Sequence, residues 1–158
     1  MKRSAPLFSA LAAVAVLCSS CSSIRATERG DASAIADRIW AFGQAHPDGF
    51  TLDIRTMTEP TEGVAVSYAA TQDSHSREQL EAVVSHALEH DGYVGGWLND
   101  DDGLYYFDST RLFPEDALDD AIRFGRENGQ RSVFALSTLT DVPIPTETNT
   151  LPSSSAAR

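Results

Sequence analysis

The chain has 158 residues, of which 23 are acidic and 12 basic, and its formal net charge is −11. With 42% hydrophobic and 22% charged residues it fits one soluble domain, and two full domains are a poor fit. The acidic excess excludes non-specific electrostatic binding to the phosphates of nucleic acids, so we expect no nucleic acid among the partners.

The N-terminal residues have the composition of an export signal. Lys2 and Arg3 form a short basic region, and residues 6–17 form an apolar stretch that is too short to span a bilayer. This combination predicts a signal peptide. An ordinary secretory signal would be cut near residues 13–15 and would leave both cysteines in the mature protein.

The residues after the apolar stretch favour a different processing step. Leu17-Cys18-Ser19-Ser20-Cys21-Ser22-Ser23 places small residues before a cysteine and resembles a bacterial lipoprotein signal. The resemblance implies that residues 1–20 are removed, that Cys21 is acylated, and that this acyl anchor is the link to the membrane. Ser22 stands where retained lipoproteins carry Asp, which implies an outer-membrane lipoprotein facing the periplasm. Because Cys18 would leave with the signal, the folded domain would hold no disulfide.

Composition divides the rest of the chain into a tether, one domain and a tail. Residues 21–32 are small and polar, and we interpret them as a tether. Residues 138–158 are rich in Thr, Ser and Pro and offer too little apolar surface to offset the entropy of ordering, which predicts disorder. Residues 33–137 remain as a single domain, long enough for one hydrophobic core.

Hydrophobic periodicity predicts elements in the order α-β-β-α-β-β-α-β. Helical spacing marks residues 34–42, 80–88 and 118–122, and alternation marks strands at 50–56, 63–69, 93–98, 104–110 and 131–137. Ser76 and Gln79 form a capping box before the second helix.

Two hairpins are expected among these strands. One joins the two strands before the second helix, and the other turns at Asp102-Gly103, a strong hairpin signal. Hairpins interleaved with helices predict an α+β fold, in which helices pack on one face of a small, mainly antiparallel sheet.

Three stretches of this domain resemble an uncharacterised small domain that recurs in proteins of Bacteroides-like bacteria. They are Gly92-Tyr93-Val94-Gly95-Gly96-Trp97-Leu98, residues 103–109 and residues 121–130. A small phage-borne module of large multi-domain proteins is similar too. The resemblance extends over residues 50–137 and implies no catalytic residue, because no activity is established for that domain.

A metal motif lies on the second predicted helix. His86-Ala87-Leu88-Glu89-His90 matches H-x-x-E-H, the inverted zinc-peptidase pattern, in which two histidines one helical turn apart bind Zn²⁺ and the glutamate activates water. A catalytic zinc also needs a third protein ligand, for which no later glutamate has a supporting motif. A zinc-dependent hydrolase using His86, Glu89 and His90 is therefore the alternative function, against two solvated histidines on a helix flank.

Other motifs indicate no cofactor. Asn99-Asp100-Asp101-Asp102-Gly103 lacks EF-hand ligand spacing and fits a solvated hairpin turn. Gly92, Gly95 and Gly96 do not lead into a helix, so they form no phosphate loop. Gly95-Gly96 within a strand instead indicates a bulge or a close backbone approach.

Aromatic residues are the most distinctive feature of the hairpin over residues 93–111. They are Trp97, Tyr105, Tyr106 and Phe107, and alternation must place rings on both faces of the sheet. One face belongs to the core, and the other suits a recognition patch because Trp, Tyr and Arg dominate binding hot spots. We predict a binding surface containing Trp97, Tyr105 and Arg111, with Asp108 nearby. The alternative is that these rings are covered by helices or only stabilise the hairpin.

The sequence thus favours a lipid-anchored protein of the cell envelope whose single α+β domain binds an envelope protein or a small ligand and is not an enzyme. The zinc hydrolase is the alternative. A third class, a structural spacer of the envelope, would carry no exposed aromatic patch.

Overall fold

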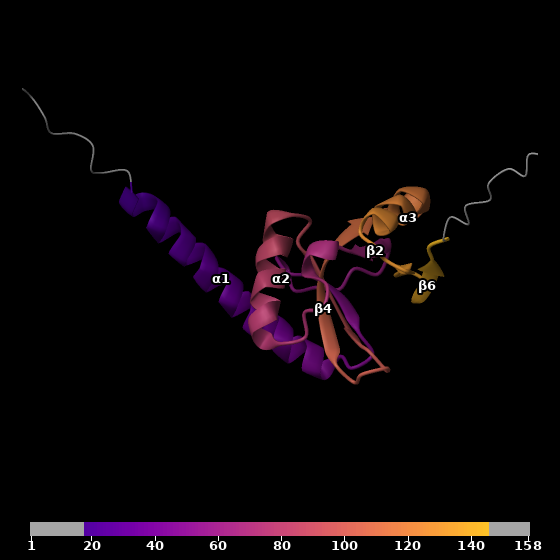
Figure 1. The fold of residues 1–158 in the computed structure, drawn as a ribbon, viewed down its shortest axis with the longest axis horizontal. Coiled ribbons are helices and arrows are strands. Elements are labelled where there is room, and N and C mark those ends of the chain that lie inside the picture. Colours follow the sequence, from indigo (N-terminus) through magenta and orange to yellow (C-terminus); the bar gives the residue numbers. More distant parts are fainter. Residues whose placement is uncertain (1–17, 146–158) are drawn as a thin grey trace, which may run out of the picture.

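The computed structural model describes residues 18–145, with side chains from residue 31 onward. Residues 1–17 of the predicted signal peptide and residues 146–158 of the predicted tail lie outside this range. The elements are α1 (Cys18–Ala45), β1 (Phe50–Asp53), β2 (Val64–Ser67), the 3-10 helix η1 (Ala69–Thr71), α2 (Arg77–Glu89), β3 (Tyr93–Leu98), β4 (Tyr105–Phe113), the 3-10 helix η2 (Glu115–Ala117), α3 (Leu118–Glu127), β5 (Ser132–Ala135) and β6 (Thr140–Pro143). The predicted α+β fold and element order are confirmed, with β6 in addition (Figure 1).

The six strands form one antiparallel sheet in the order β1-β3-β4-β2-β5-β6. The β3–β4 hairpin is confirmed, with Tyr93 opposite Thr110 at one end and Leu98 opposite Tyr105 at the other. In β2-α2-β3 and in β4-α3-β5 the two parallel strands are separated by one strand, which is the split β-α-β arrangement.

The predicted hairpin between β1 and β2 is wrong, because β3 and β4 lie between these two strands. Phe50 and Leu52 of β1 pack in a core cluster with α1 and α2, whereas Val64 and Val66 of β2 pack in a second cluster with α3. The two strands thus pack under different helices, and the turn-rich segment between them crosses over β3 and β4.

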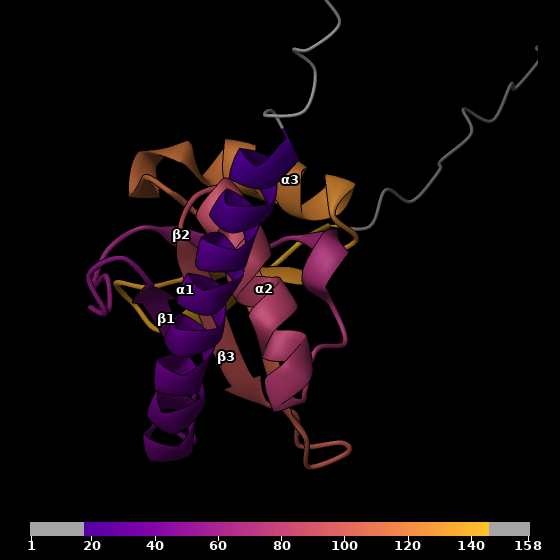
Figure 2. The ribbon, with the colours of Figure 1, turned by 90° about the vertical axis from the view of Figure 1, so that its left-hand side faces the viewer.

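All three helices pack on the same face of the sheet. Phe107 and Phe113 are six residues apart on β4, so their side chains point to one face. Phe107 belongs to the cluster under α1 and α2, and Phe113 to the cluster under α3. Figure 2 shows α1 and α2 side by side in front of the sheet. The opposite face is therefore where an exposed site can lie.

The first helix begins well before the predicted residues 34–42. It starts at Cys18 and includes residues 21–32, for which the composition predicts a tether. Residues 18–45 contain no proline, and the helix ends two residues before Pro47, since the position before a proline disfavours the helical conformation. Within residues 18–145, no helix combines the length and apolarity needed to cross a membrane.

The tail prediction is wrong in its first part: the composition predicts disorder from residue 138, but β6 pairs along β5. Val142 and Ile144 pack against the cluster under α3. A short segment with two apolar side chains is ordered here because β5 supplies backbone hydrogen-bond partners and α3 supplies an apolar surface.

The start of α2 agrees with its local signals. The Ser76 hydroxyl accepts a hydrogen bond from the Gln79 amide at 3.2 Å, and the Gln79 side-chain oxygen accepts one from the Ser76 amide at 3.0 Å. This confirms the predicted capping box and fixes the helix entry beside β4.

Candidate functional site

The sheet face opposite the helices carries an aromatic patch, which we define as Trp97, Tyr106 and Asp108. Trp97 lies opposite Tyr106 in the β3–β4 pairing, and Gly95 lies opposite Asp108, so all these positions share one face. The two rings are stacked with centroids 5.2 Å apart and planes 22° apart. Trp97 remains 46% exposed, which makes it a large apolar side chain that is both accessible and held in place.

The predicted surface of Trp97, Tyr105 and Arg111 is not one surface. Tyr105 and Arg111 point to the helix face, where the Tyr105 hydroxyl donates to the His46 carbonyl at 2.8 Å. The Arg111 guanidinium lies 4.7 Å from the centre of the Phe113 ring. The sequence signal that would have corrected this is the Asp102-Gly103 turn, because its position sets which residues of the two strands face each other.

Asp108 lies behind the indole of Trp97 and is only 8% exposed. The indole Nε1–H donates to its Oδ2 at 3.3 Å. Burial raises the pKa of Asp108 to about 6, the nearby charge of Asp73 adds to this rise, and hydrogen bonds from Trp97 and Ser67 oppose it. None of the ion pairs found among residues with described side chains includes Asp108. The patch therefore contains a buried carboxylate held by neutral donors.

The rim of the patch is acidic. The Tyr106 hydroxyl donates to Asp102 Oδ2 at 2.8 Å, and this bond raises the pKa of Tyr106. A hydrogen bond from the Leu104 amide, followed by the one from Tyr106, lowers the pKa of Asp102, which favours its ionised form. Asp100 and Asp101 are exposed in the same turn, and exposed Leu98 and Leu104 flank it. This end of the hairpin thus combines negative charge with apolar surface.

The predicted metal residues lie on the helix face. His86 Nδ1 is hydrogen bonded to the fully buried Ser109 hydroxyl at 2.9 Å, and His90 Nδ1 to the His86 carbonyl at 2.7 Å. The two imidazoles are stacked, with centroids 3.9 Å apart and planes 8° apart. Burial lowers the pKa of His86, the neighbouring charge of His90 lowers it further, and Glu89 opposes both. Sequence reasoning missed the Ser109 contact, because it joins two elements that are far apart in the chain.

Stacked rings direct their nitrogens side by side, whereas two ligands of one zinc point toward a common centre. Glu89 of the motif is exposed. Over the part of the chain whose side chains are described, no three His, Cys, Asp or Glu residues form a group that could hold a metal ion. The zinc hydrolase at His86, Glu89 and His90 stays a prediction.

Next to the helix-face histidines, Tyr68 and Arg111 surround one carboxylate. The Tyr68 hydroxyl donates to Asp91, and the pKa of Tyr68 rises to about 12, first through burial and then through this bond. Arg111 Nε lies 4.0 Å from Asp91, and Tyr68 packs edge-on against Phe124 of α3. These contacts join the end of α2 to α3 and have a structural role.

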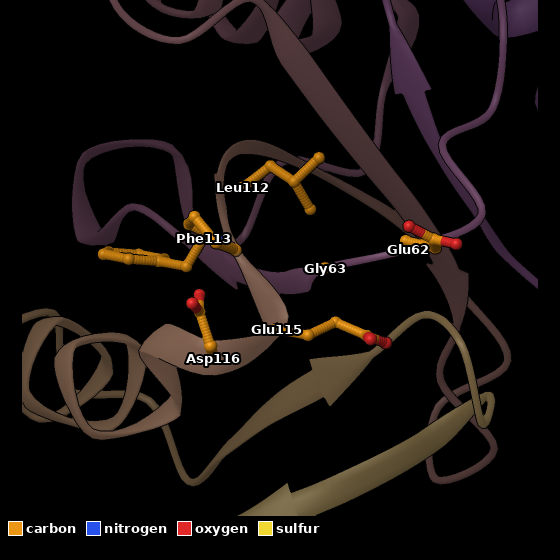
Figure 3. A pocket seen from close by; sticks show the side chains of 7 residues that line it. Glu62, Gly63, Leu112, Phe113, Glu115 and Asp116 are labelled. Carbon is orange, nitrogen blue, oxygen red and sulfur yellow. The ribbon is translucent and has the colours of Figure 1, made fainter.

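A shallow pocket lies at the end of β4, and Figure 3 shows its lining. It is lined by Glu62, Gly63, Leu112, Phe113, Pro114, Glu115 and Asp116. The three acidic side chains are exposed to solvent. We interpret the pocket as a solvated surface depression.

Cys21, the predicted lipidation site, lies in the first turns of α1, and its acylation stays a prediction. No family model matches the chain, and neither a curated protein nor a solved structure shows a significant match to it. The candidate site therefore depends on geometry alone.

Proposed function

We propose that the protein is a non-enzymatic binding domain of the bacterial cell envelope, anchored by lipid on Cys21, that docks a basic segment of a partner protein on the aromatic patch. The observation that carries this proposal is the exposed Trp97, fixed by the Tyr106 ring and by the Asp108 carboxylate. Rigid, accessible tryptophans are typical binding anchors, because little side-chain entropy is lost when a partner covers them.

Charge complementarity selects the partner. The chain carries a net charge of −11, and exposed Asp100, Asp101 and Asp102 stand beside the patch. A lysine or arginine side chain over an aromatic ring gains cation–π attraction, and an acidic rim accelerates its approach. The exposed Leu104, two residues before Tyr106, offers an apolar contact to the aliphatic stem of such a side chain.

The first helix supports the anchored arrangement. Residues 21–32 are helical, which corresponds to a rigid rise of about 18 Å between Cys21 and the start of the packed domain. Figure 1 shows the N-terminal half of α1 projecting away from the sheet. An acyl chain on Cys21 would thus hold the domain, and the aromatic patch, at a distance from the bilayer.

Trp97→Ala is expected to weaken binding of a basic peptide by about tenfold, equivalent to about 1.4 kcal/mol. The probe is a tetramethylrhodamine-labelled peptide of alternating lysine and glycine, titrated with the full chain in detergent and followed by fluorescence anisotropy. Leu139→Ala is the matched control, because Leu139 is an exposed large hydrophobic residue on the β5–β6 turn. Equal binding of a glutamate–glycine peptide, or unchanged affinity in Trp97→Ala, would contradict the proposal.

The anchor has a separate test. Cells expressing the full chain are labelled with tritiated palmitate, and the immunoprecipitated protein is expected to carry label. Cys21→Ala should abolish the label, whereas Cys18→Ala should retain it, because residue 18 leaves with the signal peptide. Label that survives in Cys21→Ala would show that Cys21 is not the acylated residue.

A further inference from the structure

We propose that Asp108 acts as a proton switch for the aromatic patch: its ionised carboxylate orients and polarises Trp97 for a cationic side chain, and protonation releases that side chain. The inference rests on the proposed function and adds its regulation. In this role Asp108 is a positioning residue, since it acts on the ligand through Trp97.

The geometry places the carboxylate where it affects the indole and is shielded from water. Asp108 Oδ2 accepts from the indole Nε1–H at 3.3 Å, while the residue as a whole is 8% exposed. Glycine at position 95 leaves the cross-strand position opposite Asp108 without a side chain. Because Asp108 itself is nearly covered, the part of the patch that a partner reaches is the 46% exposed indole.

Buried carboxylates are normally paired with a cation, because an isolated buried charge is costly. Here the hydrogen-bond partners are the neutral groups of Trp97 and Ser67. Among the residues with described side chains no cation is paired with Asp108, so its charge is left uncompensated behind the ring. An anion that accepts from an indole N–H increases the electron density of the ring, which strengthens its attraction for a cation in a site of low dielectric constant.

Protonation of Asp108 would remove both effects within the range where envelope proteins work. Burial raises the pKa of Asp108 to about 6. A lysine-containing ligand keeps its charge throughout this range, because an ordinary lysine titrates only near pH 10.4. A change of affinity around pH 6 would therefore result from titration of the protein and not of the peptide.

Other ionisable groups also lie near the aromatic patch, and their titration must be distinguished from that of Asp108. Asp73 and His75 come from the segment between η1 and α2, and the His75 ring lies 5.7 Å from the ring of Tyr106. Asp102 comes from the hairpin turn and accepts from Tyr106. A protonated His75 would also repel a cation, so His75→Gln is a required control.

The first experiment needs no ligand. The Nε1–H resonances of the two tryptophans are followed by NMR from pH 8 to pH 4.5, and Trp40→Phe assigns them. We expect the Trp97 resonance to shift with a midpoint near pH 6 in the wild type and in His75→Gln, and to lose this transition in Asp108→Asn. A Trp97 resonance that does not titrate, or a transition that persists in Asp108→Asn, would overturn the switch.

The second experiment measures affinity for the lysine–glycine peptide at pH 7.5 and pH 5.0. We expect about a fivefold weaker affinity at pH 5.0 in the wild type and in His75→Gln, and no pH effect in Asp108→Asn, which should bind as weakly as the protonated wild type. Binding that is independent of pH overturns the switch and leaves the proposed function standing. Absence of binding at both pH values, with Trp97→Ala indistinguishable from wild type, overturns both.

Discussion

Gly96→Ala is expected to lower the free energy of unfolding by about 2–3 kcal/mol, although alanine is ordinarily the better strand residue. A Cβ atom at position 96 would lie 2.5 Å from Cε1 of Phe50 and 2.9 Å from Cε1 of Tyr105. Both rings pack in or against the cluster under α1 and α2, so neither can move without opening the core. The cost is one of overpacking, which forces rings out of their rotamers or strands apart.

Gly95→Ala is the matched control, because it makes the same change on the neighbouring residue and the opposite sheet face. Its Cβ would lie 3.1 Å from Oγ1 of Thr110 and otherwise no closer than 3.8 Å to its surroundings. We expect a change within about 1 kcal/mol. Urea unfolding followed by far-UV circular dichroism measures both variants, and equal losses of stability at the two positions would refute the overpacking account.

The Gly95-Gly96 pair shows how far local sequence reasoning extends. A glycine pair in a strand indicates a bulge or a close approach of another chain segment. The β3–β4 register continues unbroken through both residues, so there is no bulge, and the structure has a close approach at Gly96. The ring that makes the approach belongs to Phe50, which is distant in sequence. Its identity depends on β1 pairing with β3, and that pairing is decided by which helix covers which strand.

The candidate site, too, is predicted by local sequence signals only in part. Local signals correctly predicted the β3–β4 hairpin and an aromatic cluster on it, because turn chemistry and alternation act over a few residues. The prediction nevertheless put Trp97 and Tyr105 on one surface, because it did not derive the strand register from the Asp102-Gly103 turn, and a shift of one residue in register exchanges the two faces. The burial of Asp108 was beyond local reasoning, because it needs neighbours from other parts of the chain.

Asp108→Asn is expected to stabilise the protein at pH 8 by up to about 3 kcal/mol and to leave its stability at pH 4 nearly unchanged. The folded-state pKa of about 6 lies above the reference value of 3.8. Between these values the folded protein holds a proton that the unfolded chain has released. Stability therefore falls as pH rises from about 4 to about 6 and stays low above, because no cationic side chain in the described part of the chain is paired with the buried charge.

Asp102→Asn should lower the stability at neutral pH, which is the opposite of the change expected for Asp108→Asn. It is therefore the control for this prediction. The pKa of Asp102 is lowered by the Leu104 amide and the Tyr106 hydroxyl, so its contribution is present at neutral pH and is lost as pH falls through the lowered value. Guanidinium unfolding of wild type and both variants at pH 4 and pH 8 separates the two cases. A stability difference between wild type and Asp108→Asn that is equal at both pH values would rule out a raised pKa for Asp108. A variant that gains stability at pH 8 while losing affinity for the basic peptide would identify Asp108 as a residue that costs folding energy and serves binding, a combination typical of functional sites.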